Sequence, residues 1–262
     1  IGSSFSLNDH IRNVALGGFS RADIEIHDGA LGVRVERSFR LGGSNAHVIN
    51  SGGNEVTIDG MDCDPHGERF HASGVKRAMI TGRDDPAKFK LLHSRIARGG
   101  LAYQVTCGHG NVIDDLDVVD MQPDAAYDSI VAAGEYNSGA ECGIVQTVGS
   151  ILDQIGTDFT GSYTNIRVHE CSTEKTSGGL GFLLYAMYLH DSLLANVSGI
   201  HLSHRGKQAG QVEDPASDAI NRLGGLFIRD SSGVVRDLIV DGLDYGLTCT
   251  GKTFPVIDGY AY

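Results

Sequence analysis

The sequence predicts an all-β fold, a right-handed parallel β-helix (solenoid) that forms one domain over residues 1–262. Three observations predict this fold class. The chain contains 36 glycines but only five prolines, a composition that favours many tight turns over a disordered linker. Short segments of alternating aliphatic and polar residues recur at irregular intervals of roughly 20 to 35 residues, as expected when loops of different length leave successive coils. Asp-Gly pairs between matched segments are few, which disfavours the alternative, a sandwich or barrel of hairpins.

The expected strands alternate with a period of two residues and end at Gly, Asn, Asp or another polar residue. In chain order they cover residues 11–16, 22–26, 31–35, 56–60, 75–80, 112–118, 165–168, 196–202 and 234–240. Two short helical turns are expected near residues 124–133 and 215–223, the second after the start signal Asp214-Pro215. An Asn, Asp, Ser or Gly beside an aliphatic residue in each segment fits the inward ladders and bends of a coil. Parallel strands stacked about 4.8 Å apart then leave one long, flat face.

Length and composition limit the possible classes of protein. A chain of 262 residues, 41% of them hydrophobic, can form a large core within one domain. No apolar run reaches the roughly 18 residues of a membrane span, so no membrane insertion is expected. The five cysteines lie far apart without a Cys-x-x-Cys pair, which disfavours a disulfide framework or a zinc site. The net charge of −12 disfavours nucleic acid as a partner. The chain starts at Ile1 without an initiator Met or a signal peptide, which predicts a fragment of a longer chain.

One segment is basic within this acidic chain. Between Arg69 and Arg98, eight Lys or Arg residues stand against two acids, a local charge of 8 − 2 = +6. Such a local field attracts small or polymeric anions. The structural alternative is a solvated charged face.

The alternating pattern over most of the chain resembles the right-handed β-helix class of pectate-lyase-like proteins. This class includes polysaccharide lyases, glycoside hydrolases, uronan epimerases and phage tailspike depolymerases. The resemblance implies a lengthwise groove that binds an extended, anionic polysaccharide and a location outside the cell or on a virion surface. A tailspike would also imply a homotrimer.

One local motif is more specific. Asp64-Pro65-His66 is similar to the Asp-Pro-His motif of alginate C5-epimerases, β-helix enzymes that remove a proton from C5 of a uronate. The resemblance implies that His66 transfers the proton and that Asp64 is its carboxylate partner. The alternative is a structural histidine in a turn that the proline fixes.

Proton removal at C5 also needs a cation that neutralises the adjacent carboxylate, and Arg suits a bidentate hold on that group. Arg69, Arg83 or Arg95 is expected to fill this role. The chain departs from the epimerase motif at Met61, where a tyrosine is expected, and at Gly67, where an acid is expected. These departures leave the second proton-transfer group open.

The second proton-transfer group is expected to be Tyr103 or His93. Both residues, with Lys88 and Lys90, are also the expected substrate-binding residues. A tyrosine can stack on a sugar ring, although it can equally belong to the core.

Paired acids give a second possible catalytic site. Asp62 alternates with Asp64, and Asp115 with Asp117, and residues i and i+2 of a strand lie on one face. Together with Asp114, carboxylates on neighbouring coils are expected to protonate a glycosidic oxygen and activate water, as in glycoside hydrolysis. The structural alternative is that these acids cap turns or form a solvated ladder.

No cofactor is certain, and Ca²⁺ is the possible one. Asp62, Asp64 and Glu68 offer the oxygen ligands that Ca²⁺ takes, and Ca²⁺ can neutralise a uronate instead of Arg. No group of His and Cys residues has the spacing of a zinc motif.

Three functions therefore remain open. The leading one is an enzyme on an extended, anionic polysaccharide, acting as a lyase, an epimerase or a hydrolase. The second is a non-catalytic glycan-binding adhesin or receptor-binding fibre. The third is a structural shaft segment that binds nothing.

Overall fold

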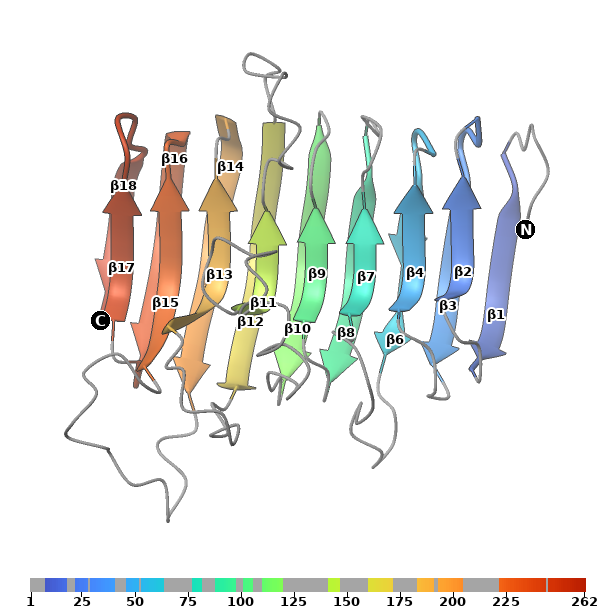
Figure 1. Cartoon of the computed structure of the whole chain (residues 1–262), viewed down its shortest axis with the longest axis horizontal. Coiled ribbons are helices and arrows are strands. Elements are labelled where there is room, and N and C mark those ends of the chain that lie inside the picture. The colour runs from blue at the N-terminus through green and yellow to red at the C-terminus, as the bar shows by residue number, and fades with distance from the viewer. Residues whose placement is uncertain are drawn as a thin grey trace, which may run out of the picture.

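The computed structural model describes fifteen stretches of the chain, and in them every regular element is a β-strand (Figure 1). The described residues are 8–17, 22–27, 29–40, 46–51, 53–63, 77–81, 88–97, 101–105, 110–119, 141–146, 160–171, 183–190, 193–204, 222–243 and 245–262. The strands are β1 (His10–Leu16), β2 (Ala22–His27), β3 (Arg34–Arg40), β4 (Ala46–Ser51), β5 (Thr57–Asp59), β6 (Asp62–Cys63), β7 (Arg77–Thr81), β8 (Lys90–Ala97), β9 (Leu101–Val105), β10 (Asn111–Val119), β11 (Glu141–Gln146), β12 (Thr160–Cys171), β13 (Leu183–His190), β14 (Leu193–His204), β15 (Arg222–Arg229), β16 (Ser232–Asp241), β17 (Tyr245–Thr250) and β18 (Val256–Ala261).

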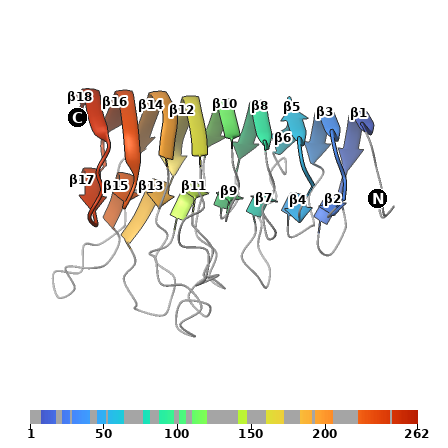
Figure 2. The ribbon, with the colours of Figure 1, turned by 90° about the horizontal axis from the view of Figure 1, so that it is seen from above.

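The strands form two parallel sheets. The larger sheet has the order β1-β3-β5-β8-β10-β12-β14-β16-β18, with β6 between β3 and β8, and the smaller sheet runs β17-β15-β13-β11-β9-β7-β4-β2. Strands close in sequence thus alternate between the sheets, which face each other along the length of the molecule (Figure 2). The all-β prediction and the large parallel sheet are confirmed, and the arrangement is consistent with a parallel β-solenoid.

Most residues of the two expected helical turns lie outside the described residues. Residues 124–133 lie outside the described residues, as do residues 215–221. At Arg222 and Leu223 the helical prediction is wrong, because these residues begin β15 and pair with Leu183 and Leu184 of β13. Tertiary pairing here overrides the local start signal. Within the described stretches no helix could cross a membrane.

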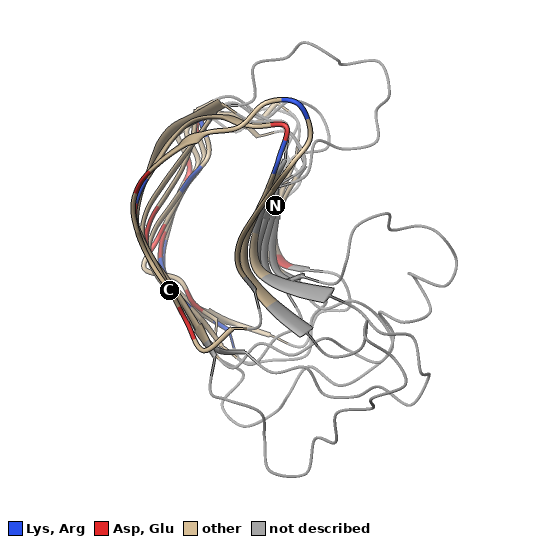
Figure 3. Ribbon diagram, turned by 90° about the vertical axis from the view of Figure 1, so that its left-hand side faces the viewer, with Lys and Arg blue, Asp and Glu red and all other residues tan. Residues whose placement is uncertain are grey.

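Every strand position of the larger sheet contains a bend at one residue with positive φ. The bends are at Asn13, Arg37, Gly60, His93, Asp115, Asn165, Gly199, Asp237 and Gly259. They lie side by side, because the residues before them are in register from coil to coil. Together they form a bend line along which the sheet curves round the core (Figure 3).

The bend changes which side chains face outward. In β10, Ile113 and Leu116 are buried, while Asp114 and Asp115 between them are not. Two consecutive residues therefore point away from the core at each bend, and the alternation of the strand resumes one residue later. In β10 this shift places two adjacent carboxylates, those of Asp114 and Asp115, on the outer face.

The core consists of apolar side chains stacked in register. Buried residues of successive strands of the larger sheet lie in one column: Val35, Ile58, Leu91, Ile113, Tyr163, Val197 and Val235. The smaller sheet adds Val48, Met187, Leu189, Leu226 and Ile228 from the other side. Each strand thus buries its apolar side chains against those of its neighbours, as the repeats of a solenoid do.

A polar cluster lies inside this core near the N-terminal end. His47 of β4 places Nδ1 2.8 Å from Asp23 Oδ2 and Nε2 3.2 Å from Ser38 Oγ. Arg40 Nε lies 3.9 Å from Asp23 Oδ2, and the side chains of Asp23, Arg40 and His47 are 0% exposed. The Arg40 guanidinium also donates to Cys63 Sγ at 3.7 Å. The cluster therefore joins the two sheets across the interior through charged groups.

The bend line predicts a specific sensitivity at Gly60. Its φ is +69°, and a Cβ added there meets the side chain and the backbone of Arg37 at ordinary contact distances. The backbone conformation, and not a steric clash, therefore determines the effect of a substitution. We expect Gly60→Val to lower the free energy of unfolding by about 1–3 kcal/mol. Gly60→Asn should cost less, because Asn tolerates the left-handed region. Equal losses in denaturant unfolding of the two variants would contradict this explanation.

Candidate functional site

The candidate site is the polar outer face of the larger sheet on both sides of the bend line. Its side chains come from adjacent strand positions β5–β6, β8, β10 and β12, and we call them the outer strip. The outer strip comprises Asp59, Asp62, His93, Arg95, Asp114, Asp115, Asp117, Arg167 and His169.

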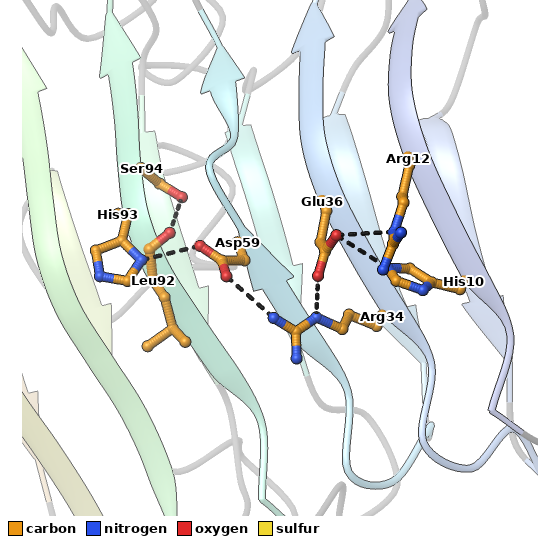
Figure 4. A network of polar contacts seen from close by, with 8 residues as sticks. All are labelled: His10, Arg12, Arg34, Glu36, Asp59, Leu92, His93 and Ser94. Atoms are coloured by element: carbon orange, nitrogen blue, oxygen red, sulfur yellow. Dashed lines mark hydrogen bonds and ion pairs between the residues drawn. The ribbon is translucent and has the colours of Figure 1, made fainter.

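One half of the outer strip is organised around His93, the bend residue of β8 (Figure 4). His93 Nδ1 lies 2.9 Å from Asp59 Oδ1, and the imidazole side chain is 59% exposed. Arg34 donates to the other oxygen of Asp59 at 3.3 Å and forms an ion pair with Glu36, so the contacts continue toward β1. Because Asp59 also accepts from Arg34, its carboxylate is held in place for His93.

The carboxylates around His93 change its protonation. The hydrogen bond to Asp59 raises the pKa of His93 and outweighs the opposing effect of burial, and the charges of Asp59, Asp115 and Asp114 act in the same direction as the hydrogen bond. The imidazole therefore keeps its proton to a higher pH than an ordinary histidine, whose pKa is about 6.5. The protonated imidazole can donate a proton, and the neutral imidazole can accept one.

The other half of the outer strip is organised around Arg95. Its NH1 lies 3.8 Å from Asp62 Oδ1 on one neighbouring coil, and its Nε lies 3.9 Å from Asp117 Oδ2 on the other. Asp117 Oδ1 is also 3.0 Å from His169 Nε2. The Arg95 side chain is 46% exposed, and ion pairs this exposed contribute only about 0–1 kcal/mol. The carboxylate of a ligand can therefore replace an aspartate at Arg95 with little loss of stability.

Asp114 is held differently from its neighbours. Thr164 Oγ1 donates to its Oδ1 at 2.6 Å, and Asn165 Nδ2 donates to the same oxygen at 2.9 Å. These hydrogen bonds, that of Thr164 first, lower the pKa of Asp114. A general acid needs the opposite shift, so the geometry does not favour Asp114 as a proton donor in hydrolysis.

The structure brings together part of the predicted site. Asp62, Arg95, Asp115 and Asp117 all lie in the outer strip, and Asp62 and Asp117 both pair in register with Arg95. The remaining predicted catalytic residues, Asp64, His66, Arg69 and Arg83, lie outside the described residues.

The predicted substrate-binding residues are spread over both sheets. His93 is in the outer strip, and Lys90 is exposed on the same strand. Lys88 Nζ donates to Glu55 Oε1 of the preceding coil at 2.7 Å. Tyr103 belongs to β9 of the smaller sheet, where only the backbone is described. Tyr103 and His93, the two alternatives for the second proton-transfer group, therefore lie on different sheets.

Sequence reasoning missed Asp59, Arg167 and His169. His169 contacts Asp117 although the two residues are 52 positions apart, and no local pattern reveals such a pair. Arg167 could have been found, because it follows the bend residue Asn165 by two positions, as Asp117 follows Asp115. Aligning the expected strands on their bends would have placed these residues side by side.

Neither a metal site among the described residues nor a similar protein assigns a function to the outer strip. Across the described residues, no group of three or more His, Cys, Asp and Glu side chains is arranged to hold a metal ion. Of the predicted Ca²⁺ ligands, only Asp62 is described, since Asp64 and Glu68 lie outside those residues. No protein-family model matches the chain, and comparisons with curated proteins and with solved structures also give no match.

The His93–Asp59 pair gives a testable pH dependence. We expect Asp59→Asn to lower the pKa of His93 because it removes the largest contribution to the upward shift. With the raised pKa, the pair stabilises the fold at pH below the ordinary His pKa, and this contribution disappears as the pH rises through the raised value. A histidine NMR titration measures the shift. Asp114→Asn is the matched control and should have a smaller effect, so equal shifts in both variants would contradict the assignment.

Proposed function

We propose that the protein acts on an extended, anionic polysaccharide that lies along the outer strip, and that it transfers a proton at C5 of a uronate sugar as a lyase or epimerase. One observation carries the proposal. A carboxylate-bound imidazole, His93, and a half-exposed guanidinium, Arg95, stand two residues apart on the outer face of one strand. Proton transfer beside a carboxylate needs this combination of an acid–base group and a fixed cation.

In the proposed reaction, Arg95 holds the sugar carboxylate and stabilises the negative charge that develops when C5 loses its proton. His93 accepts that proton when its imidazole is neutral. In elimination, the electrons of the C5–H bond form a double bond to C4 while the C4–O bond breaks and the leaving oxygen takes a proton. In epimerisation, a second group returns a proton to the opposite face of C5. The motif Asp64-Pro65-His66 follows β6 directly in sequence and is the proposed source of that group.

We further propose that the solenoid is a right-handed parallel β-helix of the pectate-lyase-like class. The alternation of strands between two parallel sheets supports this, because crossover connections between parallel strands are almost always right-handed. A location outside the cell or on a virion surface, with a tailspike-like homotrimer, belongs to the same proposal. Light scattering of the purified protein measures the subunit number.

Glycan binding without turnover, as in an adhesin or receptor-binding fibre, is the second candidate. The exposure of His93 and Arg95 favours it, because a reaction that generates a carbanion gains from a site that excludes water. A structural shaft segment would bind no glycan at all.

Product analysis separates these functions. The protein is incubated with acidic and neutral polysaccharides, with and without Ca²⁺, while ultraviolet absorbance, reducing ends and binding are followed. Incorporation of deuterium from D₂O at C5 detects epimerisation. A rise in ultraviolet absorbance or uptake of deuterium supports the proposal. New reducing ends without a rise in absorbance would indicate hydrolysis, with Asp115 and Asp117 as the catalytic groups. Binding without products would establish glycan binding without turnover. If neither binding nor products are detected in any assay, the function that remains is that of a structural shaft segment.

A further inference from the structure

One column of side chains runs along the outer strip and continues to His201 of β14. Two positions after the bend, successive coils present Asp62, Arg95, Asp117, Arg167 and His201, which we call the charge column. Acid and base alternate over its first four members. The column is therefore not a continuous basic surface of the kind that attracts dense polyanions.

The alternation of charge sets the distance between neighbouring arginines of the column. Parallel strands are about 4.8 Å apart, so the two arginines of the column, Arg95 and Arg167, are roughly 10 Å apart. A carboxylate of the protein, Asp117, lies between them. A ligand with an anionic group at every coil would meet this aspartate, whereas one with an anionic group at every second coil would meet only arginines. In an extended glycan, the second spacing is that of a disaccharide unit.

Arg167 is well placed for the second contact. Its side chain is exposed, and among the described residues it forms no ion pair. The aspartate beside it, Asp117, already contacts both Arg95 and His169. Replacing water around an exposed guanidinium by a carboxylate therefore breaks no contact within the described part of the protein.

Apolar residues mark both ends of the column. Phe39 is in register beside Asp62 and is 43% exposed, and Ile239 is in register beside His201 and is 46% exposed. The polar column from Asp62 to His201 thus spans four strand spacings, roughly 20 Å. This is the length of a short oligosaccharide of about two disaccharide units.

We propose that Arg95 and Arg167 bind two acidic groups of one glycan, one disaccharide apart, so that the protein selects chains with this charge spacing. This inference rests on the proposed function, since it assumes that the outer strip binds an acidic glycan. It adds the spacing of the substrate charges and a binding role for Arg167.

The test is binding of oligogalacturonates and hyaluronan oligosaccharides of two to eight sugars, with neutral cello-oligosaccharides and heparin as comparisons, by titration calorimetry. We expect the affinity for the hyaluronan series, which carries one carboxylate per disaccharide, to rise steeply between two and four sugars and then level off. Oligogalacturonates of the same length, which carry a carboxylate on every sugar, and heparin should bind more weakly. Arg167→Gln should remove this rise and lower the affinity for the tetrasaccharide roughly tenfold. Arg236→Gln is the matched control, because Arg236 is a similarly exposed arginine of the same sheet outside the charge column.

The outcomes separate the two proposals. If no acidic oligosaccharide binds, the proposed function fails and this inference fails with it. If acidic oligosaccharides bind but the affinity for hyaluronan grows evenly with length, only the proposed charge spacing is overturned. The same holds if oligogalacturonates of equal length bind as tightly as hyaluronan, or if Arg236→Gln lowers the affinity as much as Arg167→Gln. Activity of the Arg167→Gln variant on long chains should persist at raised KM, because Arg167 binds substrate two coils away from His93.

Discussion

Replacing Arg95 by Ala is expected to lower turnover of an acidic polysaccharide by about two to three orders of magnitude, the usual effect of removing a group that stabilises a developing negative charge. The melting temperature should change little, because Arg95 is half exposed and its ion pairs with Asp62 and Asp117 contribute little to stability. Steady-state kinetics and thermal unfolding of the same preparation measure both quantities.

Arg236→Ala is the control for this experiment. It removes a guanidinium of similar exposure, paired with Asp258 at 4.0 Å, from another strand of the same sheet. Turnover should remain close to that of the wild-type protein. A large fall in melting temperature for Arg95→Ala, or equal loss of turnover in both variants, would show that Arg95 has a structural role or that only the overall charge matters.

The largest effect on stability is expected at the buried polar cluster. Asp23→Ala should lower the free energy of unfolding by about 3–5 kcal/mol, because it removes the buried ion pair with Arg40 and the hydrogen bond to His47. Ser38→Ala, which removes only the contact to His47 Nε2, should cost about 1 kcal/mol. Chemical denaturation of the two variants gives the comparison.

A second substitution sharpens this test. Arg40→Met in the Asp23→Ala background should restore part of the lost stability, since it removes the uncompensated charge and keeps an apolar side chain of similar length. Failure to restore any stability would mean that the loss at Asp23 does not arise from Arg40. Cys63 provides an independent check, because burial raises the pKa of its thiol to about 11. It should therefore react with thiol reagents only when the cluster opens.

More of the fold than of the candidate site could be predicted from the sequence. Alternating segments, many glycines and scarce hairpin turns predicted the all-β fold and its parallel sheet because these features reflect local backbone preferences. The bends at Asn13, Asn165 and Gly60 fit the same preferences. The bend at Arg37 does not, because arginine seldom adopts positive φ. There the register with neighbouring coils determines the conformation, and a single sequence does not reveal this register.

The charge prediction shows the same limit. The segment from Arg69 to Arg98 is strongly basic in sequence, yet the structure places Glu55 against Lys88, and Asp62 and Asp117 against Arg95. Each of these acids comes from another coil. A charge summed over a segment of the sequence includes few of the residues that lie beside that segment on neighbouring coils. The electrostatic field at the surface depends on the charges of all these coils together. The predicted basic zone is therefore partly neutralised where the structure describes it.

The charge column also bears on how such a chain can change in evolution. Val112 pairs with Lys90, so one coil here is 112 − 90 = 22 residues long, and loss of residues 90–111 would bring β10 into the place of β8. The core and the bend line would still match, but Asp117 would then face Asp62, and like charges opposite each other destabilise neighbouring strands. Loss or duplication of a single coil would thus be disfavoured in this region, while changes by two coils would preserve the alternation.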